Sequence, residues 1–466
     1  MDYSAANTAL WNPIVQLGLI AVSLLAAYAL QRLVPAIRKS MIPAAVIAGF
    51  LLLLLKVLGI LGTDGEFMEI LTYHGIAIGF IALTLRVPEG NGDKGNLTGL
   101  KSGAVIVSTY MVQAIVGLGI TILLALTILP DLFEASGILL PLGFGQGPGQ
   151  ANNIGSTFEA LGFAGGRSFG LAIAAAGYLC ACIVGVIYVN ILVKRGKVET
   201  KDPAYVSGSL SVTDFQQKDE VPLGESLDRL SIQVVLVVVV YLVTFLATWG
   251  LTSGLAAVAP GLAKTLNPLL WGFNFIIGAG FAILMRVILK GLRKKRLMTQ
   301  QYQNNYLLSR ISGFAFDVMI VSALSSIEFS DLSGLWLPFF LLVAAGAVVT
   351  LIHLRAICKR VYPDYYYEGL VSMYGMMTGT ISSGVLLLRE IDPFMKTPAA
   401  NNLVLGSTFG IVLGAPIMIL VGIAPKSMTM AIVTWGICIV YYLVLLGIVR
   451  IKSRKQRIPA TWDEAK

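Results

Sequence analysis

The feature of this sequence that most constrains its fold is a series of apolar runs, each about 20 residues long. A helix needs roughly 20 apolar residues to cross a hydrocarbon core about 30 Å thick. Such runs therefore predict membrane helices. Eleven of them meet the criterion, at 11–34, 41–62, 71–87, 102–128, 168–193, 230–257, 266–290, 312–328, 333–357, 398–423 and 428–449.

The composition excludes a soluble domain. Hydrophobic residues make up 56% of the chain and charged residues only 13%, against about 25% charged in soluble domains. The formal net charge of +9 comes from basic residues in short loops between the runs, so membrane topology explains it and no nucleic-acid partner is expected. We expect an all-α polytopic protein of the cell membrane (inner or plasma membrane), with the lipid bilayer as its surroundings.

The basic residues also predict orientation, because Lys and Arg favour cytoplasmic loops. The loop after the first run holds Arg32, Arg38 and Lys39. The charged residues of the next loop are all acidic. The amino terminus is therefore predicted outside and the basic carboxyl terminus in the cytoplasm. For the bias to hold throughout, the stretches near 135–162 and 365–392 must each enter and leave on one side.

These stretches give a plan of two inverted repeats, each with five membrane helices and one re-entrant, glycine-rich hairpin. Gly145, Gly149 and Asn152-Asn153 align, at one constant offset along the sequence, with Gly375, Gly379 and Ser382-Ser383. Inverted repeats with broken helices are typical of secondary transporters; chance glycine matching is the alternative. The predicted units are residues 1–195 (first repeat, outer hairpin), 196–228 (cytoplasmic linker), 229–425 (second repeat, inner hairpin) and 426–466 (an extra membrane helix and a cytoplasmic tail).

The first hairpin has the sequence Pro-Leu-Gly-Phe-Gly-Gln-Gly-Pro-Gly-Gln at residues 141–150. Glycine costs about 1 kcal/mol and proline about 3 kcal/mol in a helix relative to alanine, so the backbone is predicted to unwind. Unwound backbone at membrane depth must be buried in protein or line a wet cavity. It frees carbonyls for sodium and amides for a carboxylate; a tight packing turn is the alternative. The binding candidates here are Gly145, Gly147, Gly149, Gln150, Asn152 and Asn153.

The second hairpin, around Tyr374 to Gly384, offers neutral hydroxyl groups that can bind an ion or an anion. Its candidates are Thr378, Gly379, Thr380, Ser382 and Ser383. Asp317 lies about five residues into its predicted run, where an ionisable group is costly and therefore a functional candidate. It can neutralise a coupling cation; the alternative is a cytoplasmic-side carboxylate that pairs with a loop base such as Arg310. Thr408, within the tenth run, is a further candidate for lining the site.

The two glycine hairpins, with Gly79-Phe80-Ile81-Ala82-Leu83 and Leu388-Arg389-Glu390-Ile391-Asp392-Pro393, resemble the sodium/glutamate symporter family, which is structurally related to sodium/citrate carriers. The resemblance implies L-glutamate as substrate and sodium as coupling ion, bound at the hairpin tips. It also implies a homodimer in which a transport part carrying both hairpins moves against a scaffold in an elevator-like way.

Other function classes are less compatible with the sequence. No HExxH or GxSxG motif is present, so an enzyme is not expected, nor is any cofactor other than the coupling ion. Unwound glycine segments also build channel filters, but these usually come as rings from several subunits. A sodium- or proton-coupled carrier of aspartate, a dicarboxylate or another organic anion stays open as an alternative.

Overall fold

The structure is a computed structural model that describes residues 2–35, 37, 42–87, 94–198, 229–298, 300–392 and 397–450. Regular structure in these residues is helical. The first half contains α1 (Thr8–Leu33), α3 (Ala44–Val57), α4 (Gly65–Leu85), α5 (Lys94–Thr127), η1 (Glu134–Ile138), η2 (Pro141–Gln146), α6 (Pro148–Ala160) and α7 (Gly166–Lys194).

The second half begins after the predicted linker, of which residues 199–228 lie outside the described part of the chain. It contains α8 (Arg229–Val258), α9 (Pro260–Gly272), α10 (Asn274–Lys294), α11 (Asn305–Ser325), η5 (Phe329–Leu332), α12 (Trp336–Val361), η6 (Pro363–Tyr365), α13 (Tyr366–Thr378), α14 (Ile381–Arg389), α15 (Ala399–Ile423), η7 (Ala424–Lys426) and α16 (Met428–Val449). The predicted tail beyond residue 450 also lies outside the described residues.

Ten helices in the described part of the chain are long and apolar enough to cross a membrane, which confirms an all-α, multi-pass membrane protein. The run predicted to cross at 41–62 is only partly helical and is not among these ten, because its helix α3 has 14 residues. At about 1.5 Å per residue it spans about 21 Å. Pro43 caps its start, and the chain turns after Leu58 at Gly59, whose φ is +69°.

Two further boundaries differ from the sequence prediction. The run at 266–290 is not one helix, since the chain breaks at Phe273 between α9 and α10. The run at 312–328 begins earlier, at Asn305, because the Asn304 side chain accepts a hydrogen bond from the Leu307 amide and caps α11. Asp317 therefore lies in the middle of its helix rather than near its start.

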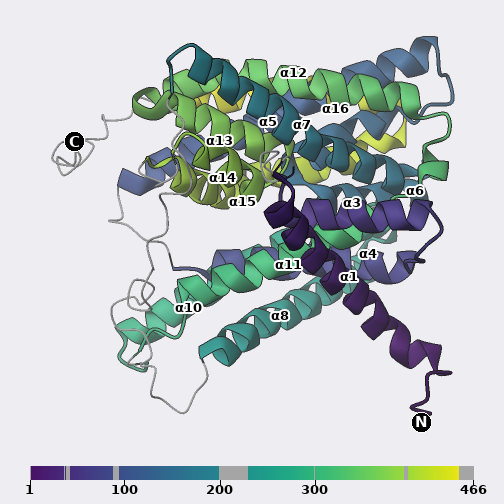
Figure 1. Cartoon of the computed structure of the whole chain (residues 1–466), viewed down its shortest axis with the longest axis vertical. Helices are drawn as coiled ribbons and strands as arrows, with labels where there is room; N and C mark the ends of the chain where they lie inside the picture. Colours follow the sequence, from purple (N-terminus) through teal and green to yellow (C-terminus); the bar gives the residue numbers. More distant parts are fainter. Residues whose placement is uncertain are drawn as a thin grey trace.

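The helices pack in two groups, which Figure 1 shows one above the other. The scaffold-side group consists of α1, α3, α4, α8, α9, α10 and α11. The hairpin-side group consists of α5, α7 and α12 to α16 with the segment from η1 to α6. In Figure 1 the hairpin-side group occupies the upper part of the view and the scaffold-side group the lower part.

Small residues set the close approach of helices within each group. A Cβ atom added at Gly75 would lie 2.9 Å from Met319 Cβ, so α4 and α11 pack almost backbone to backbone. Ser312 Oγ donates to the Gly79 carbonyl across the same contact, at 2.9 Å. In the hairpin-side group, Gly117 on α5 crosses Gly137 on η1 in the same way. Such small-residue contacts are the usual means of helix association in membranes.

Candidate functional site

The first glycine-rich stretch contains one clear helix break. Residues Pro141–Gln146 form the π-helical turn η2, and Pro148 begins α6. Between them Gly147 has φ +92° and ψ −177°, a conformation open only to glycine. The unwound backbone predicted for the whole motif is therefore concentrated at Gly147, because Gly143 and Gly145 stay within the π-helical turn.

The second glycine-rich stretch breaks between α13 and α14. Gly379 has φ −142° and ψ −108°, and Thr380 is extended at φ −140° and ψ 175°. The two breaks lie together: a Cβ atom added at Gly147 would be 3.5 Å from Thr380 Cγ2 and 3.8 Å from the Gly379 carbonyl oxygen. Segments from opposite halves of the sequence thus meet at one point.

Helix ends of both polarities converge where the breaks meet. The turn η2 and helix α13 end there, and helices α6 and α14 begin there. Terminal carbonyls at helix carboxyl ends carry partial negative charge, and terminal amides at amino ends carry partial positive charge. The junction can therefore offer carbonyl ligands to a cation and amide donors to an anion.

Gln113 on α5 holds the second break in place. Its side chain is fully buried and donates from Nε2 to Thr350 Oγ1 at 2.8 Å and to the Met377 carbonyl at 2.9 Å. A Cβ atom added at Gly145 would lie 3.0 Å from Gln113 Oε1, so the same side chain also lies beside the first stretch. One residue of α5 thus contacts both glycine-rich stretches.

Several buried amides and hydroxyls near the breaks have polar atoms without a hydrogen-bond partner among the described residues. They include Gln113 Oε1, Gln150 Oε1, both amide atoms of Asn152, Asn153 Oδ1, Thr380 Oγ1 and Ser383 Oγ. Asn153 Nδ2 is satisfied, donating to the Gly272 carbonyl at 2.9 Å. Since buried polar groups are nearly always paired in proteins, this cluster is a candidate for binding a ligand.

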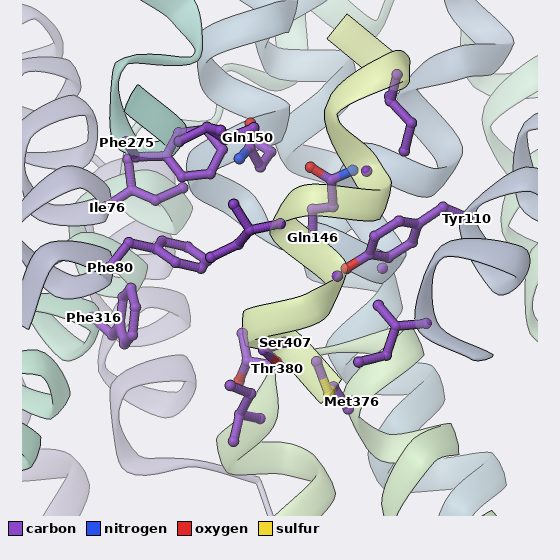
Figure 2. A pocket seen from close by; sticks show the side chains of 18 of the residues that line it. Ile76, Phe80, Tyr110, Gln146, Gln150, Phe275, Phe316, Met376, Thr380 and Ser407 are labelled. Carbon is purple, nitrogen blue, oxygen red and sulfur yellow. The ribbon is translucent and has the colours of Figure 1, made fainter. Parts of the chain in front are cut away.

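A cavity of about 120 Å³ lies beside the junction, between the two helix groups. Figure 2 shows Gln146, Tyr110 and Thr380 on its hairpin side and Phe80 and Phe316 on its scaffold side. Ser407 of α15 and Gln150 of α6 complete its polar lining. None of the lining residues, all within the described part of the chain, carries a charge. Any charged ligand here must therefore be neutralised by helix ends or by a second ligand.

The predicted site residues fall into four groups. Those that line the cavity are Gly145, Gln150, Gly379 and Thr380. Those that lie in the breaks or in the helices on either side of them, without lining the cavity, are Gly147, Asn152, Asn153, Thr378 and Ser383. The Ser382 side chain lies outside the described part of the chain.

Three predicted residues are not brought to the cavity. Gly149 packs instead against Ile76, whose Cδ1 would be 2.7 Å from an added Cβ atom. Thr408 donates to the Val404 carbonyl of its own helix at 3.3 Å, and its neighbour Ser407 lines the cavity instead. Asp317 does not line the cavity either.

The alternative pairing of Asp317 with Arg310 is wrong. The Arg310 guanidinium lies over the Tyr306 ring, 5.0 Å from its centroid. The residues that sequence reasoning missed are Gln146, Ser407, Tyr110 and the aromatic side chains on the scaffold side. Two of them had a sequence signal: Gln146 lies inside the glycine motif, and Phe80 lies in the Gly79–Leu83 segment of the resemblance.

No family model and no curated protein matches this chain. The resemblance to sodium/glutamate symporters therefore stays a prediction from the hairpin motifs.

Proposed function

We propose that the chain is a secondary active transporter that couples sodium entry to uptake of a small organic anion, with L-glutamate as the first candidate. The observation that carries this proposal is the meeting of the two helix breaks, with unpartnered amides around them, at an uncharged cavity between two helix groups. Discontinuous helices whose ends meet at the binding site are the recurrent plan of secondary transporters.

The uncharged lining supports coupling rather than simple binding. Moving an unpaired carboxylate out of water costs several kcal/mol. The cavity lining contains no Lys or Arg to offset that cost. A cation held by carbonyl groups at the ends of η2 and α13 would supply the missing positive charge beside the anion. Anion and cation would then bind together, which is the requirement for symport.

Helix pairing supports two inverted repeats with a hairpin in each. Helix α3 packs on α11, and α10 packs on α4, so the second apolar run of each half contacts the third of the other. The same exchange pairs α4 with α11 and α5 with α12. In this proposal the chain reverses its orientation between residues 1–195 and 229–425, and the two hairpins enter from opposite sides.

The transport step in this proposal is an elevator-like movement of the hairpin-side group against the scaffold-side group. The polar contacts between the groups at one end are side-chain contacts that can exchange. Glu69 on α4 accepts from Ser156 Oγ at 2.8 Å and pairs with Arg167 Nη1 at 3.4 Å. We place this end outside, in keeping with the topology from basic residues, and we expect the scaffold-side group to form the contact of a homodimer, as the resemblance implies.

Uptake of radiolabelled L-glutamate into proteoliposomes, with and without an inward sodium gradient, tests the proposal. Asn152→Ala is the most informative variant, because both side-chain amide atoms lack a partner and no hydrogen bond is lost on substitution. We expect unchanged thermal stability and loss of gradient-driven uptake. Thr408→Val is the control, since the Thr408 hydroxyl bonds only within its own helix.

Each outcome has a distinct meaning. Uptake driven by sodium in the native protein and in Thr408→Val, but not in Asn152→Ala, supports the carrier with its site at the breaks. Absence of glutamate uptake would exclude glutamate as the substrate, and other organic anions would then be screened with the same gradient. Glutamate flux that does not depend on the sodium gradient and does not saturate with glutamate concentration would favour a channel.

A further inference from the structure

Three aromatic side chains on the scaffold side of the cavity are here called the aromatic wall: Phe80 on α4, Phe275 on α10 and Phe316 on α11. Their rings contact each other, with centroid distances of 5.1 Å between Phe80 and Phe275 and 5.5 Å between Phe80 and Phe316. All three line the cavity. The same side is also lined by Ile76, Phe273, Ile276, Met319 and Ile320. Figure 2 shows the wall on the opposite side of the cavity from Gln146 and Tyr110.

The position of the wall is fixed by the packing of α4 on α11. The Phe316 ring lies directly on the Gly79 backbone, where any larger residue would clash with the ring. Ser312, one turn before Phe316, donates to the Gly79 carbonyl at 2.9 Å. This explains the Gly79-Phe80 pair in the sequence: the glycine admits one ring of the wall, and the next residue supplies another.

The wall is more than a buried core. Phe80 and Phe316 are only half-buried although they lie inside the molecule, because part of each ring faces the cavity. An aromatic ring offers no hydrogen bond to a carboxylate, and its face carries partial negative charge, so burying a carboxylate against it is costly. An ammonium group, in contrast, is attracted to a ring face. The carboxylates of a bound substrate must therefore face Gln146, Gln150 and Thr380, and its carbon skeleton is the part that extends toward the wall.

We infer that the aromatic wall determines the specificity of the proposed transporter by setting the length of the substrate's carbon chain. This rests on the proposed function. Polar groups of the substrate are held on the hairpin side, and the wall limits how far its methylene chain extends toward the scaffold. One methylene group in an apolar pocket changes discrimination by about 10–200-fold, so a rigid wall can select one homologue from a series.

The test compares binding of L-aspartate, L-glutamate and L-2-aminoadipate, which differ by one methylene group each. Binding is measured in the presence of sodium, as the ligand-induced shift in thermal unfolding, which needs no transport. The variants are Phe316→Leu and Phe80→Leu, which shorten the wall but keep an apolar side chain. The control is Phe314→Leu, since Phe314 is on the same helix as Phe316 but is 68% exposed on the outer surface.

We expect the native protein and Phe314→Leu to prefer one homologue by at least about tenfold. Both wall variants should lose about tenfold of that preference in favour of the next longer homologue. Wall variants that keep the native preference would overturn the inference, as would equal loss in Phe314→Leu. A native protein that binds none of the three would also overturn it.

Failure of the proposed function gives a different result. If the native protein binds one homologue selectively and the wall variants shift that selectivity, the inferred role of the wall in specificity is supported. If a sodium gradient then drives no uptake of the bound homologue into proteoliposomes, the carrier proposal fails alone. If uptake is driven by sodium but selectivity is unchanged in both wall variants, only the role of the wall is refuted.

Discussion

Replacing Gln113 by leucine removes the side chain that connects α5 to α12 and to the second helix break. Gln113 Nε2 donates to Thr350 Oγ1 at 2.8 Å and to the Met377 carbonyl at 2.9 Å. Met377 is the penultimate residue of α13, so its carbonyl has no partner from a following turn of that helix. Leucine has a similar volume, so the substitution tests the hydrogen bonds more than the packing.

The magnitude follows from the two bonds. An interhelical hydrogen bond in a membrane protein contributes about 0.6 kcal/mol on average and at most about 1.7 kcal/mol. A buried carbonyl left without a partner costs about 1–3 kcal/mol. Gln113→Leu should therefore lower the free energy of unfolding by about 2–4 kcal/mol. Thr350→Val removes only the bond to α12 and should cost about 0.6 kcal/mol, because Gln113 keeps its bond to Met377.

Reversible unfolding of both variants in detergent measures these differences, and sodium-driven uptake measures their effect on the site. Gln113→Leu should weaken substrate binding and raise KM. Each loss of about 1.4 kcal/mol in the binding free energy corresponds to a tenfold increase in Kd. Thr350→Val should stay close to the native protein. Equal destabilisation by the two substitutions would refute the reasoning, since it would mean that the bond to Met377 contributes nothing.

Two other contacts give predictions of their own. Gly117→Ala should lower the free energy of unfolding by about 1–3 kcal/mol, as overpacking does, because an added Cβ atom would clash with the Gly137 carbonyl; Gly280→Ala, where nothing lies within 4 Å, should cost nothing. Glu69→Gln weakens the contacts between the helix groups, because it removes the charge that pairs with Arg167 in a partly buried contact. If the substitution removes about 1 kcal/mol, uptake should become about fivefold faster. An unchanged uptake rate would show that this contact does not break during transport.

The membrane helices could be predicted from the sequence because their length is a property of the bilayer rather than of the partner helices. Their ends could not be predicted as well. Hydropathy places the start of α11 at residue 312, but the helix begins at Asn305, because Ser309 and Arg310 do not stop a helix that Asn304 caps. Hydropathy also predicted a full crossing for α3, where Pro43 and Gly59 shorten the helix.

The location of the helix breaks could be predicted, whereas the direction of individual side chains could not. Glycine and proline disfavour helix wherever they occur, so their clusters mark the breaks at Gly147 and Gly379. Consecutive residues on a helix point about 100° apart, and hydropathy does not say which side faces a partner. The sequence therefore predicts Thr408 as a lining residue, whereas its neighbour Ser407 lines the cavity.

The aromatic wall illustrates the same limit most clearly. Phe314 and Phe316 lie close together in one apolar helix, yet Phe314 is 68% exposed on the outer surface and Phe316 lines the cavity. An apolar side chain satisfies the sequence pattern equally well in either place, because lipid and an apolar cavity wall exclude water alike. The contacts of Phe316 with Gly79 and Phe80 distinguish the two positions, and they depend on a helix from the other half of the sequence.

The same dependence on distant segments holds for the two breaks. Exposed peptide groups are not tolerated in lipid, so neither break would be stable facing the bilayer alone. Each is covered by the other, since Gly147 lies against Thr380 and Gly379, and Gln113 contacts both stretches from α5. The two glycine-rich motifs therefore constrain each other through one shared environment. A substitution that displaces either break should disturb both hairpins together.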